Sequence, residues 1–324
     1  MIFIDWVSTP DHRNFNRSFF SALALKNATC LVFSKALIIP EVKCLLMPLS
    51  IGRIRQALKI LRFIWRNRKE SIVLLSYDPL FVPFASIIKK KLLVFEHNTT
   101  PVNGFSKHLV WQKLFFGRVR RMAQFPAQYG RLLCIGNNVK YIGSPVMPVM
   151  DLEQTKRVHS SPYLFLVPSY RANILELERY SELLSGTTIL AKKIVGLSSA
   201  EVHSVHNLNI HYLDRVEFFQ DGRMVDGVII TVQSRVRGTG WFNDSISNKT
   251  PIIIIDQDTK ALFEETFPGY PFISLDCIEN QAQLGKMLDQ IWCFDSMGYA
   301  KSHNARIRSR FFDMCAEMLI NLEC

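Results

Sequence analysis

The sequence lacks three features that would assign it to a particular class. It has no apolar run near the roughly 20 residues that a membrane-spanning helix needs. Its first residues, MIFIDWV, have neither a basic leader nor a small-residue cleavage site, so they predict a first strand and not a signal peptide. Its seven cysteines are scattered without a Cys-x-x-Cys pair, which indicates reduced thiols in a reducing compartment. We therefore expect a cytoplasmic protein without a transmembrane anchor.

Acidic residues are scarce in the first half of the chain. Residues 1–150 hold 22 Lys and Arg against 6 Asp and Glu, whereas residues 151–324 hold 17 against 22. The net charge of +11 therefore combines one strongly basic half with one mildly acidic half. Because no RNA- or DNA-binding motif accompanies the basic half, we expect no nucleic-acid partner. The contrast predicts two domains that face different partners.

Short apolar runs alternate with helical patterns along the whole chain. The runs expected to form strands are MIFIDWV, TCLVF, CLLMP, SIVLLSY, KLLVFEH, YLFLV, TTILAKKIV, NIHYLD, GVIITV, PIIII and PFISL. Helical spacing is found between them, notably over 51–68, 106–124 and 173–184, and again in a last segment at 297–322. This alternation is typical of βαβ units in a parallel sheet that is covered on both faces.

We therefore predict an α/β fold with two Rossmann-like, doubly wound parallel-sheet domains. Residues 144–162 carry three prolines and no periodicity, so they are the expected linker. The first domain then covers residues 1–150, and the second covers residues 151–324 and includes the terminal helix. Ligands of such sheets bind beyond the carboxyl ends of the strands, so the loops there are the expected functional sites.

An ordered series of motifs spans residues 163–256. The motifs are, in order, FLVPSYRANILELERYSELL, NIHYLDRV, VDGVIITVQS and RGTGWFNDSISNKTPIIIID. In this order the series resembles the C-terminal domain of GT-B glycosyltransferases, whereas residues 1–150 fit that family by architecture alone. The resemblance implies that the second domain binds a nucleotide-sugar donor and that the first domain binds the acceptor.

The resemblance also implies a role for particular residues. Gly238, Thr239 and Gly240, together with Arg171, would supply N–H groups and a cation to the donor diphosphate. Asp244 stands seven residues before Pro251, where the family has a glutamate that binds the ribose diol. The full set of donor residues implied is Ser169, Arg171, Arg215, Val216, Arg237, Gly238, Thr239, Gly240, Asn243 and Asp244, of which Arg215 and Val216 lie beside the base.

The sequence departs from the family pattern at several positions. Arg235 and Arg237 occupy the region where retaining members carry a second glutamate, and an acidic donor sugar, the diphosphate or a salt bridge each accounts for them. Ala172 stands where the family has a lysine, and Lys249 stands where it has a glycine. Since two family charges are missing, a catalytically silent GT-B scaffold that binds partners stays an alternative.

A second motif bears on metal binding. Asp256-Gln257-Asp258 follows an apolar strand, as does the metal-binding Asp-x-Asp of GT-A glycosyltransferases. That motif normally lies early in a chain, whereas this one lies near residue 256 of 324. We therefore expect Asp258 to cap the next helix, with no metal and no cofactor besides the donor substrate. A metal-dependent transferase that uses Asp256 and Asp258 is the alternative.

Two segments of the basic half combine apolar and basic residues at helical spacing. Residues 51–68 form an apolar stripe flanked by arginines and a lysine, and residues 107–121 repeat this pattern with fewer residues. The stripe of the first segment consists of Ile51, Ile54, Leu58, Leu61 and Trp65. Burial of both stripes under solvated arginines accounts for the pattern, and so does attachment to an anionic membrane surface.

These features together predict a glycosyltransferase of cell-surface polysaccharide synthesis. It would move a sugar from a nucleotide-sugar donor to a saccharide or lipid-linked acceptor. We expect it to be peripheral, at the inner face of the cell membrane.

Catalysis with inversion requires a general base, and two loops offer one. Asp11 and His12 follow the first expected strand, and Glu96 and His97 end the strand KLLVF. We expect Asp11 to be the base, with His12 or His97 assisting. Glu96, His97 and Asn98 form a second candidate group that could contact the donor or acceptor sugar. A helix cap at Asp11 and a buried, hydrogen-bonded His97 are the alternatives.

Overall fold

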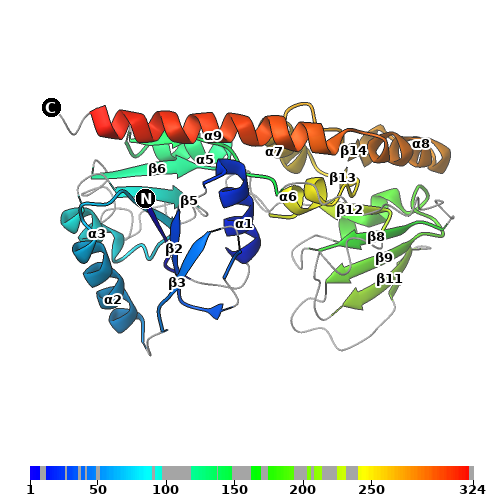
Figure 1. Cartoon of the computed structure of the whole chain (residues 1–324). Helices are drawn as coiled ribbons and strands as arrows, with labels where there is room; N and C mark the ends of the chain where they lie inside the picture. Colours follow the sequence, from blue (N-terminus) through cyan, green and yellow to red (C-terminus); the bar gives the residue numbers. More distant parts are fainter. Residues whose placement is uncertain are drawn as a thin grey trace. The chain divides into compact units, whose positions relative to one another are not determined.

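The structure is a computed structural model of the whole chain. It describes residues 1–7, 12–25, 28–35, 38–40, 42–48, 52–89, 92–96, 118–136, 138–147, 162–168, 174–192, 203–205, 208–213, 225–230 and 240–320. The chain divides into two compact units, one made of Met1–Met147 with His303–Cys324 and the other of Pro148–Ser302 (Figure 1). No helix within these described ranges is both long enough and apolar enough to cross a membrane.

A parallel sheet of seven strands forms the centre of the first unit. Its strands are β1 (Ile2–Asp5), β2 (Thr29–Val32), β3 (Lys43–Leu46), β4 (Ile72–Ser76), β5 (Leu92–Glu96), β6 (Val119–Ala123) and β7 (Val139–Tyr141). They lie in the order β3-β2-β1-β4-β5-β6-β7, and each neighbouring pair is parallel. The order reverses between β1 and β4, which is the point where open sheets of this kind bind ligands.

Successive side chains of each strand point to opposite faces of the sheet, so the core of the first unit has two parts, one on each face. The helices are α1 (His12–Leu23), α2 (Arg53–Arg66), α3 (Val82–Ile88), α5 (Pro126–Leu133) and the part of α9 (Ser296–Ile320) from His303 onward. Phe3 and Val73 belong to a cluster that α1 and α9 cover. The next residue of each strand, Ile4 or Leu74, belongs to a second cluster covered by α2 and α3. The helices therefore enclose the sheet from both sides (Figure 1).

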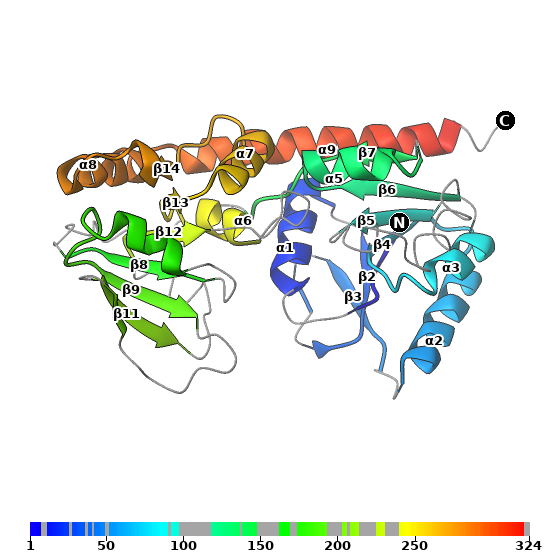
Figure 2. The ribbon, with the colours of Figure 1, turned by 180° about the vertical axis from the view of Figure 1, so that it is seen from behind.

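The part of α9 from His303 onward packs on the first unit. The side chain of Asn304 bonds both backbone groups of Val146, at 3.0 Å to its N–H and 2.6 Å to its carbonyl. Lys140 pairs with Glu317 at 2.5 Å, so α9 runs beside β7 (Figure 2). The sequence analysis placed the whole terminal helix in the second domain, whereas in the structure the residues from His303 onward belong to the first unit.

The second unit has a strand order similar to that of the first, with one additional strand at an edge. Its strands are β8 (Leu164–Val167), β9 (Thr188–Lys192), β10 (His203–Val205), β11 (Leu208–Leu213), β12 (Gly227–Ile230), β13 (Ile252–Ile254) and β14 (Ile273–Ser274). They lie in the order β10-β11-β9-β8-β12-β13-β14. β10 is antiparallel to β11, and the other described pairs are parallel. Here the order reverses between β8 and β12.

Two groups of helices accompany the second sheet. They are the 3₁₀ helix η4 (Ile174–Tyr180) with α8 (Gln281–Trp292), and α6 (Gly240–Ser247) with α7 (Gln257–Thr266). Leu177 of η4 and Leu284 of α8 share one core cluster with Ile229 and Ile253 of the sheet. Phe242 of α6 meets Phe263 of α7 edge to face, with ring centroids 4.9 Å apart.

The predicted fold class is confirmed, and each apolar run expected to form a strand overlaps one. The expected helix over 106–124 is wrong for 119–123, which form β6, and most of the rest lies outside the described residues. Two adjacent arginines in β6 hide its strand pattern. The helix expected over 173–184 is the shorter 3₁₀ helix η4. Of the expected linker, residues 148–161 are not among those described.

Lys249 ends α6 in a conformation that favours glycine. The Thr250 N–H donates to the Ser245 carbonyl at 2.9 Å, and the Lys249 N–H donates to the Ile246 carbonyl at 3.2 Å. This pair of bonds is a Schellman cap, and its left-handed residue is Lys249, with φ of +55°. The glycine that the resembled family carries at this position would adopt this conformation without a clash at Cβ.

We expect Lys249→Gly to raise the free energy of unfolding by roughly 0.5–1 kcal/mol, because it removes the left-handed strain. The matched control is Lys286→Gly in the exposed interior of α8, which should lower the free energy of unfolding by about 1 kcal/mol. Urea denaturation followed by circular dichroism measures both changes. If both substitutions lowered the free energy of unfolding by the same amount, the left-handed cap at Lys249 would be contradicted.

Candidate functional site

The structure describes three of the residues predicted for the donor site. Gly240, Asn243 and Asp244 all belong to α6. The other predicted donor residues lie outside the described residues, and they are Ser169, Arg171, Arg215, Val216, Arg237, Gly238 and Thr239. Among the predicted catalytic residues, His12 begins α1, whereas Asp11 and His97 also lie outside the described residues.

The N-terminus of α6 follows β12, a strand at the reversal point of the second sheet. The first N–H groups of a helix lack intrahelical acceptors and carry a partial positive charge, so they favour phosphate groups. A Cβ built on Gly240 would meet no atom of the described chain within 4 Å. The packing of these residues therefore does not require glycine at position 240, and alanine there is a clean probe of ligand contact.

Asp244 lies one turn further along α6 than Gly240. The two residues are four apart, so they share one face of the helix and lie about 6 Å apart along its axis. This spacing suits a ligand whose phosphate meets the helix end and whose sugar lies beside the next turn. Asn243 lies next to Asp244 and is buried.

The carboxylate of Asp244 is half-buried and has no partner among the described residues. Its backbone carbonyl accepts from the N–H and the side-chain amide of Asn248, at 3.0 and 2.8 Å, but its side chain accepts from neither. Burial alone raises the pKa of Asp244 to about 7. Such a carboxyl group gains free energy from a ligand that donates hydrogen bonds to its ionised form, as a vicinal diol does.

A second polar cluster lies where the first sheet reverses its order. Asp5, at the end of β1, is fully buried. One carboxylate oxygen accepts from the Ser76 hydroxyl at 2.5 Å, and the other accepts from the Asn16 amide at 2.8 Å. The Ser76 oxygen in turn accepts from the Val7 N–H at 2.8 Å. These bonds join the ends of β1 and β4 to α1, and they fix both ends of the loop that contains Asp11.

A buried ion pair joins the end of β5 to the middle of β6. Glu96 pairs with Arg121, and these side chains are 2% and 1% exposed. The Tyr77 hydroxyl donates to both carboxylate oxygens of Glu96, at 2.8 and 3.0 Å. Burial and the charge of Glu96 raise the pKa of Tyr77, which keeps its proton on the hydroxyl. The expectation that Glu96 contacts a sugar is therefore wrong, because protein groups occupy its carboxylate.

Sequence reasoning missed Asp5 and the partners of Glu96. The signal for Asp5 was present, since a single acidic residue ends the apolar run MIFID. No signal in the sequence pairs Glu96 with Arg121, because the two residues are 25 positions apart and meet only through the sheet.

Asp256 has a structural role. Its two carboxylate oxygens accept from the N–H and the hydroxyl of Thr259, at 2.7 and 2.6 Å, so Asp256 is the N-cap of α7. The prediction that Asp258 caps this helix is wrong, since Asp258 lies in the first turn with its side chain exposed. Within the described ranges, no group of three His, Cys, Asp or Glu side chains is placed to hold a metal ion.

We expect Asp244 to make stability depend on pH. Between its ordinary pKa of 3.8 and its folded pKa of about 7, the unfolded chain has lost this proton and the folded chain keeps it. Stability should therefore fall as the pH rises through this window. Asp244→Asn cannot ionise, so it should match the wild type near pH 4 and exceed it by roughly 1–3 kcal/mol at pH 8.

Urea denaturation at several pH values measures this difference. Asp258→Asn is the matched control because it removes the same charge from an exposed aspartate in a neighbouring helix. If the free energies of unfolding of Asp244→Asn and the wild type differed by the same amount at every pH from 4 to 8, the pKa of Asp244 would not be raised in the folded protein.

Comparisons with known proteins bear on the fold. No protein-family model matches the sequence. No curated protein matches it either. Among solved structures, Anabaena Alr3699/HepE in complex with UDP-glucose matches with a TM-score of 0.57 and 11% identity, over 99% of this chain and 98% of that chain. WaaG, a glycosyltransferase involved in lipopolysaccharide biosynthesis, matches with a TM-score of 0.54 and 10% identity, over 95% and 94% of the two chains.

At these identities the likeness concerns the fold alone. Both matched structures align with nearly the whole chain. The resemblance found in the motif series is thereby confirmed at the level of the fold. The chain has the GT-B glycosyltransferase fold.

Proposed function

We propose that the protein is a glycosyltransferase of cell-surface polysaccharide synthesis. It moves a sugar from a nucleotide-sugar donor to a saccharide or lipid-linked acceptor, on the cytoplasmic side of the cell membrane. The observation that carries the proposal is the geometry of α6, in which Gly240 precedes by one turn the half-buried carboxylate of Asp244, a group without a partner among the described residues. The solved structures of Anabaena HepE with UDP and with UDP-glucose support a ligand of the same class.

In this proposal the second unit binds the donor. The backbone N–H groups of residues 238–240 and the cations of Arg171 and Arg237 bind the diphosphate, because they match its charge and its acceptor oxygens. Asp244 accepts two hydrogen bonds from the ribose diol. Arg215 and Val216 lie beside the base, and Ser169 and Asn243 complete the donor contacts.

The first unit supplies the general base. Asp11 removes the proton of the acceptor hydroxyl while that oxygen attacks the anomeric carbon, and the nucleoside diphosphate leaves with the bonding electrons. His12 or His97 assists. The bonds of Asp5 to Ser76 and Asn16 support this role, since they fix the ends of the loop that carries Asp11.

Calorimetric titration with UDP-, dTDP-, GDP- and CMP-sugars tests the donor site. One class should bind, and Asp244→Asn should weaken that binding by about 1–3 kcal/mol, since it removes hydrogen bonds to a charged group. Gly240→Ala should also weaken binding, because its new Cβ meets the ligand and not the described protein. Gly130→Ala, on α5, is the matched control, since a Cβ there also meets nothing described within 4 Å.

Two results would contradict the donor site. One is that no nucleotide sugar binds, and the other is that Asp244→Asn and Gly240→Ala both bind like the wild type. Binding of a donor without transfer to any acceptor would identify a silent scaffold in place of an enzyme.

For catalysis, we expect Asp11→Asn to lower turnover by about 10²–10⁴-fold, because asparagine preserves a helix cap and removes the base. Donor affinity and the denaturation midpoint should not change, which separates a catalytic loss from misfolding. Steady-state assays with the donor found by titration give the turnover. If Asp11→Asn had nearly normal turnover, Asp11 would not be the base and would act only as a helix cap.

A further inference from the structure

The helix α2 exposes an apolar stripe. Ile54, Leu58 and Trp65 are 65%, 58% and 55% exposed. At 3.6 residues per turn these three side chains and the half-buried Leu61 fall within an arc of about 60° on the helix. Single exposed apolar residues are common on proteins, but four aligned along one helix mark a contact surface.

The stripe is separate from the face that anchors α2. Ala57, Ile60 and Ile64 are the apolar residues that α2 buries in the core of the first unit. The interpretation that the stripe predicted from the sequence is buried is therefore wrong for Ile54, Leu58 and Trp65. The neighbouring helix α3 adds exposed apolar area through Phe84 and Ile87, which are 43% and 52% exposed (Figure 1).

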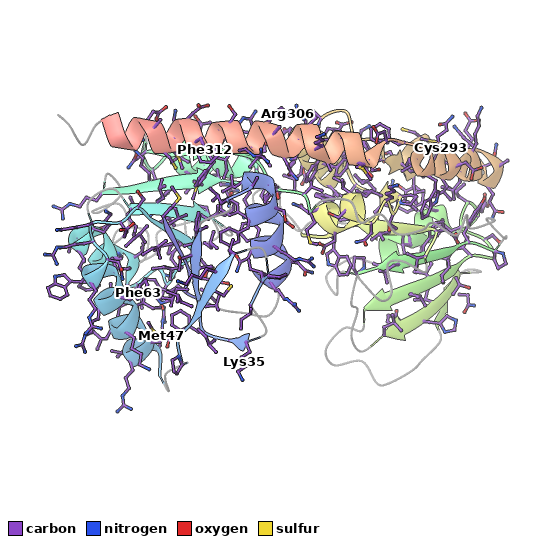
Figure 3. The ribbon with its side chains drawn as sticks, viewed as in Figure 1. Lys35, Met47, Phe63, Cys293, Arg306 and Phe312 are labelled. Carbon is purple, nitrogen blue, oxygen red and sulfur yellow. The ribbon has the colours of Figure 1, made fainter. Side chains whose placement is uncertain are left out.

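Basic side chains border the stripe on one side. Arg55, Lys59, Arg62 and Arg66 are exposed and fall in a second arc of about 60°, next to the first. Nitrogen-tipped side chains extend from α2 away from the strands (Figure 3). None of these four residues has an acidic partner in the described part of the chain, whereas Arg53 is paired with Asp78. The helix itself contains no acidic residue.

We propose that α2 docks on an anionic lipid surface. The stripe lies in the boundary between headgroups and acyl chains, and the four cations meet lipid phosphates. A second copy of the chain does not suit this surface, because the basic side chains of the two α2 helices would lie against each other and repel. The aliphatic Ile54 and Leu58 argue against nucleic acid, which uses aromatic stacking. This inference does not depend on glycosyl transfer.

Flotation of the full-length protein with vesicles tests the proposal. Vesicles of phosphatidylcholine with phosphatidylglycerol should bind the protein, vesicles of phosphatidylcholine alone should bind it weakly, and added salt should reduce binding. Arg55→Gln/Arg62→Gln should weaken binding about 25-fold, at about 5-fold for each cation. Leu58→Ser/Trp65→Ser should also weaken it, because both changes remove apolar area.

Matched controls are available on α9. Lys301→Gln/Arg306→Gln removes two exposed cations, and Met297→Ser/Phe312→Ser removes two exposed apolar side chains (Figure 3). Neither control should change vesicle binding, and circular dichroism verifies that every variant is folded. These four positions lie on a different helix from the stripe.

Three results would overturn the proposal. They are equal binding to neutral and anionic vesicles, equal losses in the α2 variants and their α9 controls, and no vesicle binding at all. Binding to single-stranded RNA that exceeds vesicle binding, and that the α2 variants abolish, would assign the surface to nucleic acid instead.

Discussion

A parallel sheet that is buried on both faces is the constraint on which the rest of this chain depends. Each strand has to be apolar on both sides, and each connection has to cross the sheet, so polar groups gather where the strands end. The reversal of strand order separates the connections that follow β1 and β4, and likewise those that follow β8 and β12. In the first unit, Asp5 and Ser76 lie at this point and are hydrogen-bonded to each other.

The buried carboxyl groups of the two units have different surroundings. In the first unit, Asp5 and Glu96 receive hydrogen bonds from protein groups on neighbouring elements, so their charges stabilise the ends of the strands. In the second unit, Asp244 is half-buried without a described partner, and its pKa is raised. A paired carboxylate is explained by the architecture. The described residues offer no such explanation for Asp244, and the proposed donor site gives this carboxyl group a partner.

The sequence predicted the parts of the fold that depend on apolar pattern. Strands with purely apolar runs, such as β4 and β13, were found directly, whereas β6 was missed because Arg120 and Arg121 interrupt its pattern. Periodicity alone does not show which side of α2 faces the core, since an exposed stripe and a buried one have the same spacing. Gly240 and Asp244 were singled out by the order of motifs, and their donor-binding roles stay predictions. The partners of Glu96 were not predictable because distant strands bring them together.

The titration of the Asp244 carboxyl group, followed by nuclear magnetic resonance on protein labelled with ¹³C-aspartate, tests the central claim most directly. Asp244→Asn assigns the signal. In the free protein the pKa of Asp244 should be about 7, and it should fall when UDP is added, because the ribose diol donates hydrogen bonds to the ionised form. An ordinary pKa in the free protein, or a pKa that bound UDP leaves unchanged, would contradict the account.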